Sequence, residues 1–192
     1  MTTNTLSTRT FEGVTIPQPG TFVIDPAHTT VGFVARHLMV SKARGSFGDI
    51  TGEITIGDNP LDSNVTARIG AASIDTGHAD RDAHLRGADF LDVERFPHLT
   101  FRGLRVAHVR DSEFVLAGEL TIRDVTREVE LLVEFEGLAR SPWGQEVVGF
   151  TATTEIDREA FGITWNQALE TGGVLVGRRV KIEISAEATR QA

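Results

Sequence analysis

Residues 180–187 read Val-Lys-Ile-Glu-Ile-Ser-Ala-Glu, an alternation of apolar and polar side chains over eight positions. Residues 128–135, Glu-Val-Glu-Leu-Leu-Val-Glu-Phe, repeat the pattern with a single interruption. Successive side chains of a strand point to opposite faces, so such runs are typical of strands with one face in a core and the other in water. Noisier versions of the same period occur over residues 31–39, 50–56, 65–74, 99–106, 114–122 and 148–156.

Turn-forming residues separate these runs, for example Gly-Asp-Asn-Pro at 57–60 and Ser-Pro-Trp-Gly at 141–144. About eight strands at near-regular spacing predict an antiparallel sandwich or barrel in one all-β domain. Residues 79–87 are the exception. They predict one short helix that begins at Asp80 as N-cap and ends at Gly87. An eight-stranded barrel would also remove exposed sheet edges and enclose room for one small ligand.

Composition excludes several classes of protein. The chain has 192 residues, no cysteine and a net charge of −8, so disulfides, thiolate metal sites and cysteine nucleophiles are absent. The acidic balance argues against nucleic-acid binding, which needs cations to neutralise phosphates. No apolar run is long enough to span a bilayer as a helix.

The first twenty residues are rich in threonine and lack the basic start and apolar stretch of a secretion signal. We therefore expect a cytoplasmic protein. With prolines at 17 and 19, residues 1–20 are interpreted as a segment that is either flexible or loosely docked. The folded domain is predicted to occupy residues 21–188.

Five strings, in order, resemble the YceI-like polyisoprenoid-binding family. They are residues 21–37 (TFVIDPAHTTVGFVARH) with Gly-Ser-Phe at 45–47; 73–76 (SIDT) with 81–85 (RDAHL); 89–92 (DFLD) with 96–101 (FPHLTF); 118–126 (GELTIRDVT); and 156–165 (IDREAFGITW). The resemblance covers residues 21–187. It implies a lipocalin-like, eight-stranded antiparallel barrel that holds a long isoprenoid or similar amphiphilic chain. Many members carry a secretion signal, so the resemblance breaks down at residues 1–20.

The inward faces supply the candidate ligand contacts, since an apolar chain gains free energy when it leaves water. His37 is included because alternation places it on the same strand face as Val31, Phe33 and Ala35. Trp165 is included because it could either plug one end of the barrel or contact the ligand at its rim. The predicted ligand-binding residues are Val31, Phe33, Ala35, His37, Ile50, Ile54, Phe101, Phe114, Leu116, Phe150 and Trp165. Each could equally fill a packed core.

An anionic lipid head group would need cations. The candidates are Lys42, Arg44, Arg81 and Arg86. The string from Asp80 to His84 also suggests metal ligands or an Asp82–His84 acid–base pair, but structural capping is the preferred interpretation because no spaced ligand motif is present. We expect no catalytic residue, no metal and no cofactor other than a bound lipid.

The leading hypothesis is a carrier, storage or sequestering protein for a polyisoprenoid or similar amphiphile. One alternative is a lipid-modifying enzyme that uses Asp82 and His84; another is an assembly module whose barrel is filled by side chains. The expected partner is the lipid, with at most transient membrane contact and with a homodimer left open.

Overall fold

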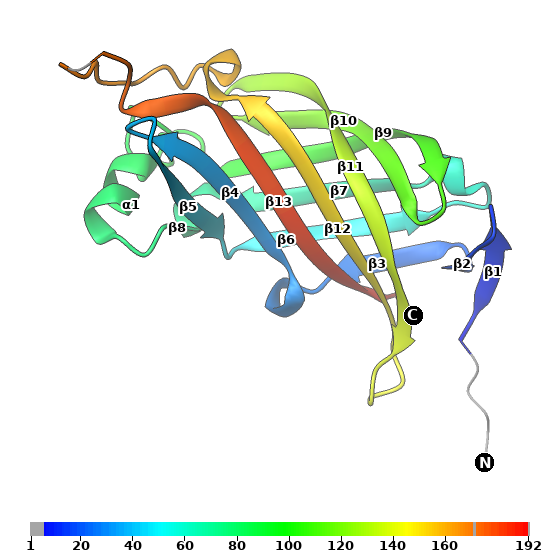
Figure 1. Cartoon of the computed structure of the whole chain (residues 1–192). Coiled ribbons are helices and arrows are strands. Elements are labelled where there is room, and N and C mark those ends of the chain that lie inside the picture. Colours follow the sequence, from blue (N-terminus) through cyan, green and yellow to red (C-terminus); the bar gives the residue numbers. More distant parts are fainter. Residues whose placement is uncertain (1–5, 171, 192) are drawn as a thin grey trace.

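The computed structural model describes residues 6–170 and 172–191. Within them the chain forms thirteen strands, one α-helix and four short 3-10 helices (Figure 1). The strands are β1 (Thr8–Phe11), β2 (Val14–Pro17), β3 (Gly20–Ile24), β4 (Thr30–His37), β5 (Ser41–Phe47), β6 (Ile50–Ile56), β7 (Asn64–Gly70), β8 (Ile74–Asp75), β9 (His98–Arg110), β10 (Glu113–Ile122), β11 (Val125–Arg140), β12 (Glu146–Asp157) and β13 (Val176–Arg190). The helices are α1 (Ala79–Arg86), η1 (Pro26–His28), η2 (Pro60–Asp62), η3 (Ala71–Ser73) and η4 (Arg158–Phe161).

Eight of these strands close into an antiparallel ring. Their order is β12-β11-β10-β9-β7-β6-β3-β13, and β13 pairs with β12 to complete the circle. The closing register runs without a bulge from Val147 opposite Thr189 to Asp157 opposite Arg179. This ring confirms the predicted eight-stranded antiparallel barrel.

β13 holds a second set of strands outside the ring. Its last residues, 188–190, pair with β3, whereas residues 176–185 pair with β4. β5 and β8 follow β4 in the sheet, and α1 lies beside them at one end of the barrel (Figure 1). The barrel wall is therefore extended by a flap of three strands at the helix end.

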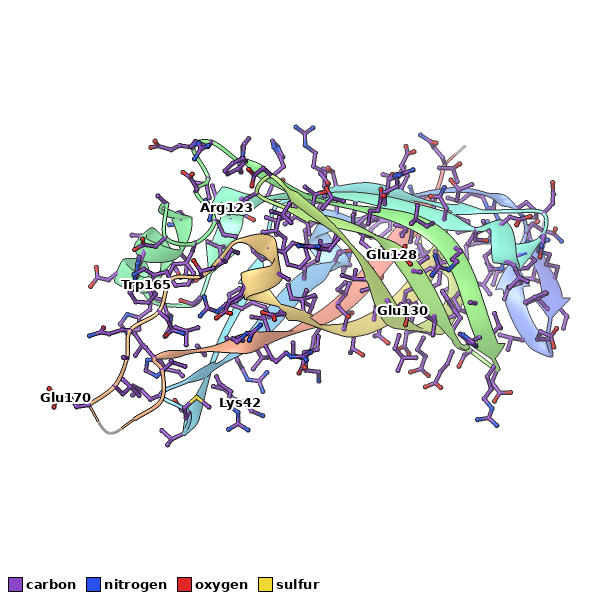
Figure 2. The ribbon with its side chains drawn as sticks, turned by 90° about the horizontal axis from the view of Figure 1, so that it is seen from above. Lys42, Arg123, Glu128, Glu130, Trp165 and Glu170 are labelled. Carbon is purple, nitrogen blue, oxygen red and sulfur yellow. The ribbon has the colours of Figure 1, made fainter. Side chains whose placement is uncertain are left out.

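The alternating strands turn their apolar residues inward, as the period of two predicts. Phe22, Ile50 and Val148 are almost wholly buried, and they belong to a single core cluster that spans the barrel. Polar positions between them face water, including Glu128 and Glu130 on β11 (Figure 2). Burial of these apolar faces is the main term that stabilises the sheet.

Helix α1 ends at Gly87 as predicted, but its N-cap residue is His78 rather than Asp80. The His78 side chain makes no capping hydrogen bond, and Asp82 makes the polar side-chain contacts at this end. Its buried carboxylate accepts hydrogen bonds from the Thr76 N–H at 2.9 Å and the Thr76 hydroxyl at 2.6 Å. No helix in the described part of the chain is long and apolar enough to cross a bilayer.

Residues 8–17, inside the segment predicted to be flexible or loosely docked, form the β1–β2 hairpin at the end of the barrel opposite α1 (Figure 1). Arg9 donates to the carbonyl oxygens of Gly57 and Asp58. The chain just after the hairpin is held by Arg190, which donates to the Gln18 and Pro19 carbonyl oxygens. Residues 1–5 lie outside the described residues.

Glu146 joins the N-terminal segment to both neighbouring strands. Its carboxylate accepts from the Ser7 N–H at 2.8 Å, Arg190 Nε at 2.5 Å and Arg140 at 3.4 Å. Burial alone would raise the pKa of Glu146, but the hydrogen bonds from Ser7 and Arg190, with the charges of Arg190 and Arg140, lower that pKa below its ordinary value of 4.5. A carboxylate with a lowered pKa stabilises the folded state above that ordinary value, and the contribution is lost as the pH falls.

We predict that Glu146→Gln lowers the free energy of unfolding at neutral pH by about 1–3 kcal/mol, because charged hydrogen bonds to Arg190 and Arg140 are lost. The variant should also lose less stability than the wild type between about pH 6 and about pH 3, since one titrating group is gone. Urea unfolding at several pH values measures both effects. Parallel pH profiles of the two proteins would contradict the prediction.

The β4–β5 turn is strained. Leu38 and Met39 both have positive φ angles, 51° and 60°, and the Val40 N–H donates to the His37 carbonyl oxygen at 3.2 Å. Two central residues with positive φ are typical of a type I′ turn, which favours asparagine and glycine. Large side chains in this conformation cost about 1–2 kcal/mol each.

Replacing Leu38 by Asn and Met39 by Gly should therefore raise the free energy of unfolding by about 1–2 kcal/mol. Thermal and urea unfolding of the double variant test this. A matched change at the β1–β2 turn, Glu12→Asn, should have a smaller effect because that turn already has glycine at position 13. A double variant less stable than the wild type would contradict the assigned turn conformation.

Candidate ligand-binding cavity

The barrel encloses a cavity of about 380 Å³. Side chains of all eight ring strands and of β4 line it, and the β1–β2 hairpin contributes Phe11, Val14, Ile16 and Pro17 at one end. Leu85, Phe90 and Leu91, in and after α1, line it as well. The volume lies in the range of about 300–1,000 Å³ that is usual for small-molecule sites.

Most of the residues predicted from inward faces lie on this wall. They are Val31, Phe33, Ala35, Ile50, Ile54, Phe101, Phe114, Leu116 and Phe150. They come from β4, β6, β9, β10 and β12, so the structure brings together side chains that are far apart in sequence. Phe135 and Phe150, on adjacent strands, pack with ring centroids 5.3 Å apart.

Two predicted residues, His37 and Trp165, are not among the described residues that line the cavity. His37 is the last residue of β4, opposite Val176, and β13 has a register shift between Val176 and Val180. The pairing of β4 with β13 is therefore irregular at the end where His37 lies. A position-by-position alternation cannot detect such a shift in the partner strand.

Trp165 packs into the aromatic cluster that covers the helix end (Figure 2). Its ring meets the His84 ring edge-on at 4.6 Å and the Phe90 ring at 5.3 Å. Phe90 is itself buried and lines the cavity. Trp165 therefore contacts the cavity-lining residue Phe90 without being among the described lining residues itself.

Arg158 is the one basic side chain among the described residues that line the cavity, and it is only 4 % exposed. Its Nη1 donates to the carbonyl oxygens of Ile163 at 2.8 Å and Trp165 at 2.9 Å. Nε donates to the Gly177 carbonyl oxygen at 2.9 Å, and Nη2 to that of Val176 at 3.3 Å. Burial lowers the pKa of Arg158 from its ordinary value, although the guanidinium stays charged. This side chain ties the connection between η4 and β13 to the barrel.

Sequence reasoning missed Arg158, although one signal was available. Ile156 lies on the inner face of β12, so a period of two places residue 158 on that same face. Its four partners are backbone carbonyl groups, two after η4 and two at the start of β13, and backbone groups carry no sequence motif.

We predict that Arg158→Met lowers the free energy of unfolding by about 3–5 kcal/mol, because four buried or half-buried carbonyl groups lose their donor. Amide exchange should rise in the connection between η4 and β13. Arg178→Met provides the control. Arg178 is exposed and pairs with Asp157 and Glu159, so its loss should cost about 1 kcal/mol or less. Equal costs for the two variants would contradict the role of Arg158.

The predicted head-group cations lie outside the cavity wall, among the described residues. Arg81 donates to the Thr76 hydroxyl and carbonyl oxygens, and Arg86 donates to the carbonyl oxygens of Ala72 and Ile74, both at 2.8 Å. These two arginines hold α1 against the chain that precedes it. Lys42 and Arg44 are exposed on β5.

Asp82 and His84 direct their polar atoms to different partners. Asp82 is occupied by Thr76, as described above, and hydrogen bonding by the Thr76 side chain is the main cause that lowers the Asp82 pKa. His84 Nε2 lies 2.8 Å from an Asp89 carboxylate oxygen, and its ring packs on Phe90 and Trp165. Both polar side chains thus hold the helix end together through separate partners.

One group of side chains outside the cavity is close enough to share a metal ion. His28 Nδ1 lies 2.8 Å from Asp25 and 3.8 Å from Glu187. Asp25 also accepts from the Ala27 N–H and so caps η1. Hydrogen bonds within the group account for its geometry.

Taken together, closed antiparallel strands around an apolar interior define a lipocalin-like barrel. The model of the YceI-like domain matches residues 22–188, and the chain belongs to this family. A UPF0312 protein of Staphylococcus aureus strain USA300 is 43% identical over 169 residues, which cover 86% of this chain and 95% of that protein. These matches confirm the resemblance seen in the five sequence strings.

Solved structures show the same fold. BcnA of Burkholderia cenocepacia matches with a TM-score of 0.74 at 22% identity, covering 86% of this chain and 99% of that one. A polyisoprenoid binding domain from Saccharophagus degradans matches with a TM-score of 0.65 at 12% identity, covering 88% and 98%. At these identities the likeness is one of fold.

Proposed function

We propose that this protein binds a polyisoprenoid or a similar long-chain amphiphile inside the barrel and acts as its carrier, store or sequestering agent. The observation that carries the proposal is the cavity itself, with its almost entirely apolar wall and a volume of about 380 Å³. A barrel filled by its own side chains would leave no such space, so the assembly-module alternative gains no support.

The physical chemistry of an apolar chain fits this site. Burying one methylene group contributes about 0.8 kcal/mol, so about ten of them contribute roughly 8 kcal/mol. Association costs about 4–15 kcal/mol in lost freedom of motion. Hydrophobic burial alone can therefore offset much of that cost. The polyisoprenoid binding domain from Saccharophagus degradans, which has the same fold, supports the choice of ligand class.

Binding without turnover is part of the proposal. The enzyme alternative gains no support from the geometry, because Asp82 and His84 serve separate structural partners. We propose no metal and no cofactor besides the lipid. A cytoplasmic location stays a prediction from residues 1–20, and a homodimer stays open.

Native mass spectrometry of freshly purified protein, followed by organic extraction, tests the proposal. We expect a stoichiometric extra mass that extracts as a polyprenyl or other long-chain amphiphile. Phe114→Asp places a charge in the cavity wall. It should abolish the extra mass, since a bound apolar chain would leave that charge buried and unpaired. Ala186→Phe should reduce it by filling space while keeping the wall apolar.

Leu132→Asp is the matched control. Leu132 is on β11, one residue from the inward-facing Val133, but its side chain is 52 % exposed on the outer face. This variant should carry as much lipid as the wild type. An unaltered lipid load in folded Phe114→Asp and Ala186→Phe, or an apo mass with no uptake of offered lipids, would overturn the proposal.

A further inference from the structure

The tip of the β4–β5 hairpin exposes three consecutive apolar side chains. Leu38, Met39 and Val40 are 39 %, 50 % and 83 % exposed. Leu38 and Met39 also adopt positive φ angles that asparagine and glycine would adopt with less strain. Folding alone thus favours neither the exposure nor the conformation of these residues, and such outliers often mark functional surfaces.

A cationic surface lies directly behind this tip. Arg36 and Lys42 are opposite each other in the β4–β5 register, and Arg44 follows on the same face, opposite Val34. All three cations are exposed. Like charges placed opposite each other across two strands destabilise a sheet. The arrangement becomes favourable when an anionic surface faces the hairpin.

Neighbouring strands supply carboxylates that offset part of this positive charge. On the same face of β13, Lys181 pairs with Glu183 at 2.7 Å, and Glu183 lies 3.8 Å from Arg44. Further carboxylates lie nearby: Asp75 is opposite Ser46 of β5, Glu155 is opposite Lys181, and Glu170 lies in the loop before β13 (Figure 2). The β4–β5 hairpin itself carries only cations. Residues 26–48 contain no aspartate or glutamate, although the whole chain has a net charge of −8.

The tip also adjoins the cavity. The Leu38 N–H donates to the Leu175 carbonyl oxygen at 2.9 Å, and the next residue, Val176, lines the cavity and pairs with His37. Met39 reaches Gly173 in the same connection. Lys42 and Trp165 lie at the same end of the molecule (Figure 2), which is the end covered by α1.

We propose that the β4–β5 tip docks the protein on an anionic phospholipid bilayer: Leu38, Met39 and Val40 enter the interfacial region, and Arg36, Lys42 and Arg44 contact lipid phosphates. Apolar side chains backed by cations are the combination that binds peripheral proteins to anionic membranes. Docking at this end would bring the cavity wall close to the bilayer. The inference goes beyond the proposed ligand, because membrane docking requires only the tip.

Co-sedimentation of the full chain with vesicles tests this proposal. Vesicles of equal parts phosphatidylcholine and phosphatidylglycerol should bind the wild type, and vesicles of phosphatidylcholine alone should bind it at least about tenfold more weakly. Raising the salt concentration should weaken binding to the anionic vesicles, because the cations are exposed. Failure of the wild type to bind anionic vesicles would overturn the proposal.

Two variants separate the apolar and cationic contributions. Leu38→Asn with Met39→Gly should reduce vesicle affinity about tenfold or more while the protein unfolds at a higher temperature. Lys42→Gln with Arg44→Gln should reduce it by a similar factor and flatten the salt dependence. The melting temperature thus distinguishes a variant that fails to bind because it is misfolded from a folded variant that has lost its contacts with the lipid. Wild-type affinity in either double variant would overturn the proposal.

Trp143→Ser is the control for an exposed apolar residue elsewhere. Trp143 is 85 % exposed in the β11–β12 turn, away from α1, so vesicle affinity should not change. A loss of affinity in this variant would assign docking to the wrong end of the barrel and refute the proposal. Phe114→Asp, which tests the lipid cavity, should still bind vesicles. The two proposals can therefore fail independently.

Discussion

Hydrogen-bonded closure of the sheet by β13 is the constraint on which the rest of the structure depends. This strand pairs with β12 along eleven register positions, and it also provides the edges on which β3 and β4 align. A closed ring satisfies the backbone groups that an open sheet would leave at its two edges. It also sets an interior diameter at which side chains can either fill the barrel or leave room for one small ligand. In this barrel the inward side chains leave a cavity.

Different interactions cover the two ends of this barrel. At one end an apolar hairpin lies across the opening, held from outside by the Glu146–Arg190 ion pair. At the other end aromatic rings cover α1, and Arg158 donates to two carbonyl groups of the connection after η4 and to two at the start of β13. Polar groups at both ends hold chain segments in place, so the wall between them can remain apolar. A site of this kind suits a ligand that is chosen by shape and apolarity.

The sequence patterns predict the residues of the cavity wall better than the residues at the two ends of the barrel. Alternation placed Phe33, Phe114 and Phe150 on inward faces, because the period of a strand depends only on local geometry. The surroundings of His37 and Arg158 depend instead on irregular pairing with β13 and on carbonyl groups from two separate segments of the chain. Both are tertiary features. The β1–β2 hairpin escaped prediction because two four-residue strands are too short for alternation to be recognised.

The first and last strands of the ring lie side by side, and this has a consequence for how the chain can be connected. The Gln191 N–H donates to the Thr21 carbonyl oxygen at 2.9 Å, and Arg190 bonds to residues 18 and 19. The first and last strands of the ring are therefore neighbours at their free ends. A short linker could join them, and the exposed turn at residues 141–145 could supply new termini without removing a ladder hydrogen bond. The circular order of the strands, rather than the point where the chain starts, specifies this barrel, which makes the protein well suited to circular permutation.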